Sequence, residues 1–196
     1  LLLSLPIFIF LMLFSEPMLM VFGNQFNDFT SLRILATGMM IQTFFGLGSS
    51  SLTMSGFSNL NLLNVSIALI VNIILNFILI PQYGILGAAF ATTFSLIIIS
   101  ALRFFENYYI LDLNLFSSKL IKPLISGIFV ILISILFQKY ILNMINYSLS
   151  VFNLLAYLFL GLSFVLIGYF IFYSTLGIDK EDSEMLHVLK NKFFNR

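Results

Sequence analysis

The sequence predicts an all-α integral membrane protein, and three observations support that fold class. The 196 residues are 60% hydrophobic and only 9% charged, whereas a soluble domain has about 25% charged residues. The mean hydropathy is +1.08, so a soluble fold could not hide its apolar side chains from water. Apolar runs of about twenty residues recur along the chain, and about twenty helical residues cross the hydrocarbon of a bilayer.

About six transmembrane helices are expected within one bundle that covers residues 1–176. Their approximate ranges are 1–14, 28–53, 60–80, 85–107, 120–141 and 149–176. The chain has no initiator methionine and opens inside an apolar run. We therefore expect it to be the C-terminal part of a longer protein.

The first two spans differ in polarity. Ser15-Glu16-Pro17 is expected to close the first, because proline lacks an N–H and clashes with the preceding helical turn. In the second span, small and polar residues follow four- and three-residue spacings and share one stripe: Gly38, Gln42, Gly46, Ser49 and Thr53. Two interpretations remain open: the stripe lets a neighbouring helix approach closely, or Gln42 lines a hydrated substrate cavity. Arg33 is expected to snorkel to the membrane interface, with phosphate binding as the alternative.

The third span carries an asparagine stripe, formed by Asn61, Asn64, Asn72 and Asn76. These residues stay within about 60° either side of one line on a helical wheel of about 100° per residue. An amide that faces lipid tails would leave donors and acceptors unpaired, at a cost of several kcal/mol. The stripe must therefore face protein, water or a ligand. Hydrogen bonds between helices and the lining of a cavity are both compatible with it.

A helical hairpin is expected where the third span meets the fourth. Pro81 is expected to end the third span, and Gly84 provides the backbone freedom for a tight turn. Small residues then recur at four-three-four spacing and predict a groove for a packing partner: Gly84, Ala88, Ala91 and Ser95. Arg103 and Glu106, three residues apart, are expected to form an exposed pair on the helix surface. Gly161 and Gly168 in the last span also suggest close packing.

Residues 177–196 are the polar tail, and they fit a short amphipathic helix at the membrane surface. Placing the tail in the cytoplasm puts most basic residues on that side: Arg103, Lys119, Lys122, Lys180, Lys190, Lys192 and Arg196. Arg33 and Lys139 then lie toward the outside. The positive-inside rule favours this orientation, with a cytoplasmic C terminus in a multi-pass protein of the cell membrane.

Composition also limits the function. The chain has no cysteine, one histidine and a net charge of +1, so metal centres, other cofactors and nucleic-acid partners are not expected. It has no nucleotide-binding glycine loop. No span has a carboxylate near its middle, so we expect no enzyme activity. A channel and a structural subunit remain possible, but a transporter with a polar cavity fits the asparagine stripe best.

The segment from Asn72 to Thr93, with its pattern N…N..LIPxYGxxGAAxAT, resembles a pattern of the polysaccharide-lipid flippases. These belong to the multidrug/oligosaccharidyl-lipid/polysaccharide exporter superfamily, which is MATE-like. Ser15-Glu16-Pro17, Phe22-Gly23 and the segment 32–35 also fit that pattern, and the similarity covers about residues 5–115. The resemblance implies a two-lobe transporter, of which this chain would be most of the C-terminal lobe and the missing N-terminal lobe the partner.

The resemblance further implies the substrate and the site. Such proteins move a polyprenyl-pyrophosphate-linked oligosaccharide across the membrane by alternating access, for surface polysaccharide or glycan assembly. Gln42, Asn64, Asn72 and Asn76 would then line the cavity and offer neutral hydrogen bonds to sugar hydroxyls, while bilayer lipids surround the bundle. The superfamily also contains cation-coupled drug antiporters. Such an antiporter and a non-transporting membrane scaffold are the alternative functions.

Overall fold

The computed structural model describes residues 2–23, 28–45, 47–112, 121–144 and 151–176. Within these ranges the chain forms seven α-helices and no strand: α1 (Ser4–Met20), α2 (Phe29–Phe44), α3 (Leu47–Met54), α4 (Ser58–Tyr83), α5 (Ile85–Ile110), α6 (Ile121–Met144) and α7 (Val151–Thr175). The all-α prediction is therefore confirmed. The predicted tail, residues 177–196, lies outside the described residues.

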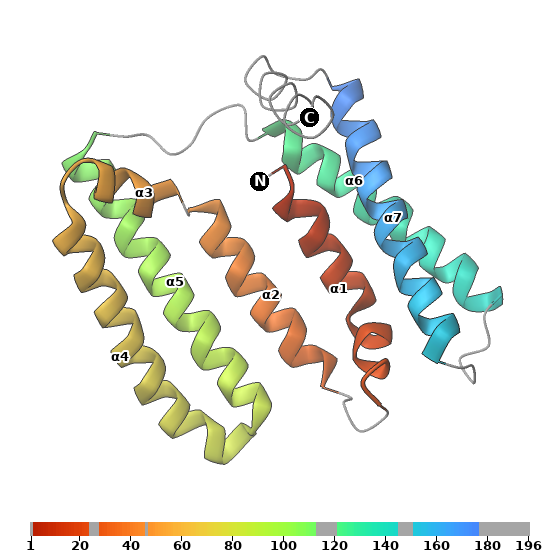
Figure 1. The fold of residues 1–196 in the computed structure, drawn as a ribbon, viewed down its shortest axis with the longest axis horizontal. Helices are drawn as coiled ribbons and strands as arrows, with labels where there is room; N and C mark the ends of the chain where they lie inside the picture. Colours follow the sequence, from red (N-terminus) through yellow and green to blue (C-terminus); the bar gives the residue numbers. More distant parts are fainter. Residues whose placement is uncertain (1, 24–27, 46, 113–120, 145–150, 177–196) are drawn as a thin grey trace, which may run out of the picture.

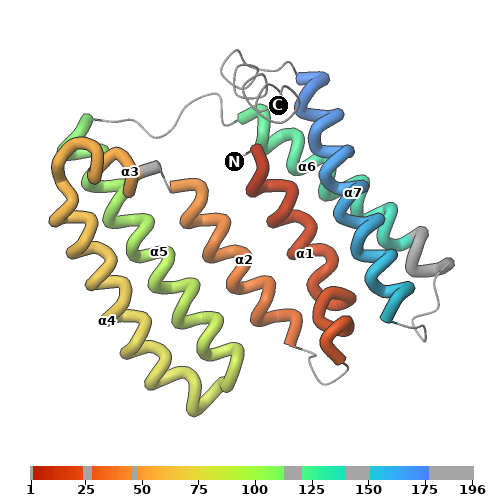
Figure 2. The backbone as a smooth tube through the Cα atoms, in the orientation of Figure 1, coloured from red at the N-terminus to blue at the C-terminus, as the bar shows by residue number. Residues whose placement is uncertain are grey.

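In chain order the longer helices run alternately up and down, so α2 and α5, which lie side by side, run in the same direction (Figure 1). Their order across the molecule is α4, α5, α2 and α1, after which α6 and α7 both pack on α1. The smooth backbone trace shows the same order, with short α3 near the ends of α2 and α5 (Figure 2). The end of α1, the start of α2 and the turn between α4 and α5 share one edge of the bundle. The opposite edge holds α3, the end of α5 and the start of α6.

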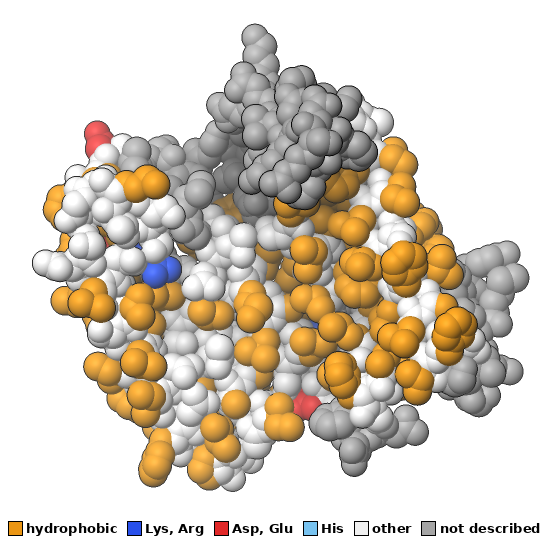
Figure 3. Space-filling model, viewed as in Figure 1, with side chains coloured by type: hydrophobic (Ala, Val, Ile, Leu, Met, Phe, Trp, Pro, Cys, Tyr) orange, Lys and Arg blue, Asp and Glu red, His pale blue; other side chains and the backbone are white. Residues whose placement is uncertain are grey.

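In the part of the chain that the structure describes, four helices are long and apolar enough to cross a membrane: α4, α5, α7 and the part of α6 from Ile121 to Lys139. Helix α1 is apolar but shorter, with 17 residues. Helix α2 has 16 residues and a length of about 24 Å, less than the roughly 30 Å of bilayer hydrocarbon. Large hydrophobic side chains cover much of the surface, and few charged ones interrupt the face drawn in Figure 3. The chain is a multi-pass membrane protein.

The predicted close of the first span at Ser15-Glu16-Pro17 coincides with a break in α1, but the helix does not end there. The helix kinks at Phe14 and continues through Pro17 to Met20. Proline removes the N–H that would bond the carbonyl four residues earlier, which here belongs to Leu13. Gln138 of α6 replaces that donor, because its Nε2 donates to the Leu13 oxygen at 2.9 Å. A side chain distant in sequence thus provides the hydrogen bond that the Leu13 carbonyl loses at the proline, and the helix continues past the kink.

The range 28–53, predicted as one span, is divided into α2 and α3. Serine and glycine residues make α3 a weak helix former. Contacts with α5 hold it in place: Phe45, just before α3, packs edge-to-face on Phe104 at 5.5 Å between ring centroids. Asn107 Nδ2 also donates to the Gly48 carbonyl at 3.0 Å. Tertiary contacts with α5 therefore hold α3 as a separate short helix instead of a continuation of α2.

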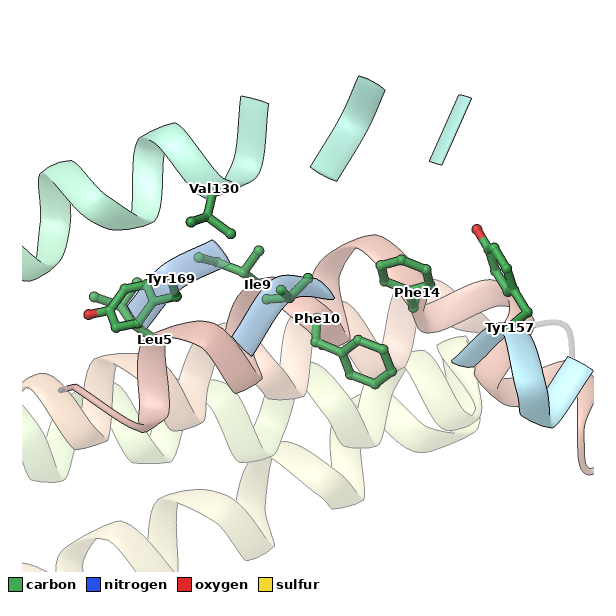
Figure 4. Packing of buried hydrophobic residues seen from close by; sticks show 8 residues of the cluster. Leu5, Ile9, Phe10, Phe14, Val130, Tyr157 and Tyr169 are labelled. Carbon is green, nitrogen blue, oxygen red and sulfur yellow. The ribbon is translucent and has the colours of Figure 1, made fainter. Parts of the chain in front are cut away.

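A cluster of buried hydrophobic residues joins α1 to α6 and α7 (Figure 4). It consists of Leu5, Ile9, Phe10, Phe14, Val130, Tyr157, Val165 and Tyr169. A Cβ at Gly161 would lie 2.5 Å from the Phe14 ring, so the expected close packing at Gly161 is confirmed. At Gly168 the nearest atom would be 4.0 Å away. The second glycine therefore marks no tight approach.

Candidate functional site: a polar seam between α4 and α5

Helices α4 and α5 form the hairpin that the sequence predicts. Gly84 has a φ of +58° in the turn, and its N–H donates to the Ile80 carbonyl at 2.8 Å. Helix α4 ends at Tyr83, two residues after Pro81, so Pro81 lies in the last helical turn rather than ending the helix. A Cβ at Gly87 would lie 2.3 Å from the Leu79 carbonyl oxygen. The two helices thus come close enough for short polar side chains to reach across.

The polar seam is the row of polar side chains along the α4–α5 contact that includes Asn61, Asn64, Asn72 and Asn76 of α4. Asn72 and Asn76 lie in the part of this seam nearer the turn. Asn72 Nδ2 donates to Ser95 Oγ at 3.2 Å and to Thr92 Oγ1 at 3.5 Å, both on α5. Asn76 Nδ2 donates to Asn72 Oδ1 at 2.9 Å. Both asparagines are half-buried. The amides therefore form a short chain that leads from the helix surface into the α4–α5 contact.

Asn64 lies deeper in the same contact, with 1% of its surface exposed. Its Nδ2 donates to a carboxylate oxygen of Glu106 on α5. Its Oδ1 is buried and has no hydrogen-bond partner among the described residues. The seam thus continues from neutral amides to a charged group.

Arg103 and Asn61 extend the seam to α3. Arg103 is 8% exposed, and its Nε donates to Asn61 Oδ1 at 3.2 Å. The same oxygen accepts from Ser49 Oγ at 3.3 Å, while Asn61 Nδ2 donates to Thr53 Oγ1 at 3.4 Å. Three helices therefore converge on one asparagine.

The expectation of an exposed Arg103–Glu106 pair is wrong. Arg103 is buried, Glu106 is half-buried, and no ion pair joins them in the described part of the chain. Each instead bonds an asparagine of α4. The cause is α3, which packs on both α4 and α5 and covers most of the Arg103 side chain.

The structure brings together three of the four predicted site residues. Asn64 and Asn72 lie along the α4–α5 contact and donate hydrogen bonds to α5, while Asn76 donates to Asn72 within α4. Gln42 lies apart on α2, half-buried and without a hydrogen bond to any described residue. Their role as cavity lining stays a prediction. The predicted small-residue groove is present in part: Ala91 and Ser95 are buried, whereas Gly84 is exposed and Ala88 is half-buried.

Sequence reasoning missed that Arg103 and Glu106 belong to the seam. A signal was present, because Asn64 and Glu106 lie at similar distances before and after Gly84. A hairpin that turns at Gly84 brings such positions opposite each other. Arg33 is a separate feature at the other edge: its Nε donates to Ser15 Oγ at 2.7 Å, and its guanidinium lies 5.0 Å from the centre of the Phe29 ring.

Two archaeal membrane proteins are similar to this chain. An uncharacterized membrane protein of Methanocaldococcus jannaschii, MJ1068, is 31% identical over 121 residues, which are 62% of this chain and 24% of that protein. A second, MJ1375 of the same organism, is 36% identical over 81 residues, which are 40% of this chain and 20% of that protein. The alignments thus span about a quarter or less of each relative. No family model matches the chain. No solved structure matches it either.

Proposed function

We propose that this chain is most of the C-terminal lobe of a transporter. The transporter moves a polyprenyl-pyrophosphate-linked oligosaccharide across the cell membrane by alternating access. The sugar head group travels in a hydrated cavity between two lobes, while the lipid tail stays in the bilayer. The resemblance of the hairpin segment 72–93 to polysaccharide-lipid flippases is one support. The archaeal relatives support only the membrane location, since both are uncharacterized membrane proteins.

The observation that carries the proposal is the chain of amides at Asn76 and Asn72. Large hydrophobic side chains surround it on α4, including Ile73 and Phe77, which are exposed as a lipid-facing or lobe-facing surface would be. The Oδ1 of Asn76 accepts no hydrogen bond from the described residues. Neutral amides suit sugar hydroxyls because each offers both donors and an acceptor. They also bind without the strong attraction of an ion pair, so the sugar can be released.

Replacing Asn72 or Asn76 with leucine tests this function in the full-length protein. Export of the lipid-linked glycan is expected to fall at least tenfold. Asn72→Leu should lower the free energy of unfolding by about 1 kcal/mol, as is typical of bonds between membrane helices, and Asn76→Leu, which loses a bond within α4, should lower it by no more. A glycan-export complementation assay and thermal unfolding in detergent would be run on the same variants. Ser66→Leu is the matched control, since Ser66 is exposed on α4 and its hydroxyl donates only to the Leu62 carbonyl of its own helix. Normal export by both asparagine variants would refute a role in the sugar pathway.

The proposed orientation places the C terminus in the cytoplasm. The helix ends that meet near the α4–α5 turn then face outward, and the edge that holds the end of α5 and the start of α6 faces inward. Lys122 lies at the inner edge, as the positive-inside rule requires. A cysteine in place of exposed Gln82 should react with an impermeant thiol reagent in intact cells. A cysteine in place of exposed Asp112 should react only after permeabilisation. The chain has no cysteine to interfere, and the opposite labelling pattern would reverse the orientation.

A further inference from the structure

The guanidinium of Arg103 has more hydrogen-bond donors than partners. Arginine carries five N–H groups, and in the described part of the chain only Nε has a partner, the Oδ1 of Asn61. The terminal nitrogens are not among the fully buried atoms that lack a partner, so they reach a surface. The Arg103 side chain is thus buried along its stem and hydrogen-bonded at Nε, while its two terminal NH₂ groups make no hydrogen bond to a described residue.

The carboxylate of Glu106 favours the charged form of Arg103, but the two side chains form no direct ion pair within the described residues. Helices α3 and α4 contain no Asp, Glu, Lys or Arg. Glu106, one turn along α5, makes no ion pair with Arg103, and Asn64 holds its carboxylate. The face drawn in Figure 3 is largely hydrophobic or uncharged. A positive charge that has no direct ion-pair partner in such surroundings is costly, so it favours contact with an anionic group.

The position of Arg103 indicates which anions can reach it. It lies seven residues before Ile110, the last residue of α5, and therefore about 10 Å from the end of that helix. An arginine side chain at this depth can meet the phosphate level of a bilayer by snorkelling. Ser49 and Thr53 of α3 lie on the same side, around Asn61.

We propose that Arg103 binds one phosphate group carried by a lipid, with Asn61 as the positioning residue. Asn61 holds Nε, and the planar guanidinium presents its remaining N–H groups to two phosphate oxygens at once. The phosphate belongs either to the head group of an anionic bilayer lipid or to a polyprenyl-linked molecule. A site for a bilayer lipid is independent of the proposed transport, whereas a site for a polyprenyl-linked phosphate rests on the proposed function.

The experiment measures lipid binding to the full-length protein in detergent by native mass spectrometry. Three probes are titrated: phosphatidylglycerol, a short polyprenyl pyrophosphate and uncharged diacylglycerol. Arg103→Gln is expected to weaken binding of a phosphate-bearing probe by about tenfold or more, because charge-assisted, two-point hydrogen bonding is lost. Arg103→Lys should weaken it less, since lysine keeps the charge without the fork. Asn61→Leu should weaken it by about threefold, and Lys122→Gln, at the start of α6, is the basic control without effect.

The pattern of loss identifies the source of the phosphate. Loss for phosphatidylglycerol alone assigns a bilayer lipid, loss for the pyrophosphate alone assigns a polyprenyl carrier, and loss for both assigns a shared site. Arg103→Lys and Asn61→Leu keep the test valid if Arg103→Gln does not fold. Unchanged binding in the folded Arg103 and Asn61 variants would overturn the proposal, as would an equal loss for diacylglycerol. A binding defect with normal glycan export supports the phosphate site while separating it from the transport function.

Discussion

Gly87→Ala is expected to lower the free energy of unfolding by about 3 kcal/mol, at the upper end of the usual cost of overpacking. The new Cβ would lie 2.3 Å from the Leu79 carbonyl oxygen and 2.6 Å from its carbon. These are backbone atoms of α4, so no side-chain rotation can relieve the clash. The two helices must separate near their turn, which also weakens the hydrogen bonds from Asn72 to α5. Thermal unfolding of the purified protein in detergent measures the loss.

Gly168→Ala is the matched control for this prediction. It places the same methyl group on a membrane-embedded helix, but the nearest atom would be 4.0 Å away. Alanine also has the better helix propensity, so Gly168→Ala should keep or slightly raise the unfolding temperature. Equal unfolding temperatures for Gly87→Ala and the wild type would show that α4 and α5 are less closely packed than described here.

Asn64→Leu is expected to cost about 2 kcal/mol, more than the loss of an ordinary bond between membrane helices. Asn64 is almost fully buried, and its Nδ2 donates to the Glu106 carboxylate. Leucine has a similar size but no donor, so the substitution leaves a half-buried charge without that partner. The unfolding free energy of the variant in detergent or in mixed micelles measures the effect.

A double-mutant cycle separates this contact from changes in packing. Glu106→Leu removes the carboxylate that accepts the hydrogen bond from Asn64. Adding Asn64→Leu in that background should therefore lower the free energy of unfolding clearly less than it does in the wild type. The difference is the coupling between the two side chains. If Asn64→Leu costs the same with and without Glu106, the bond contributes nothing to stability, and the buried position of Asn64 needs another explanation.

Several features of the fold follow from local sequence. Long apolar runs require membrane helices, because an apolar surface of that size is incompatible with water. Gly84 marks the turn between α4 and α5, since a positive φ suits glycine. The spacing of the asparagines places them on one helix face, and they do share one contact in the structure. Each of these properties depends on residues close together along the chain.

What the asparagines face depended on the tertiary structure. Periodicity reports that residues share a face but not which helix covers it, so the bonds to Ser95 and Glu106 could not be derived from the stripe alone. Proline in α1 illustrates the same limit: its effect on helix length depended on Gln138, a donor 125 residues from Leu13 in sequence.

The polar end of the seam shows this division most clearly. The sequence by itself determined that Arg103 and Glu106 lie one turn apart near the end of a membrane helix. Only the tertiary structure decided that they do not pair, because α3 packs over Arg103 while Asn61 and Asn64 each bond one of them. The physical reason is that the environment of a charge depends on what surrounds it in space, and those surroundings come from three separate segments of the chain.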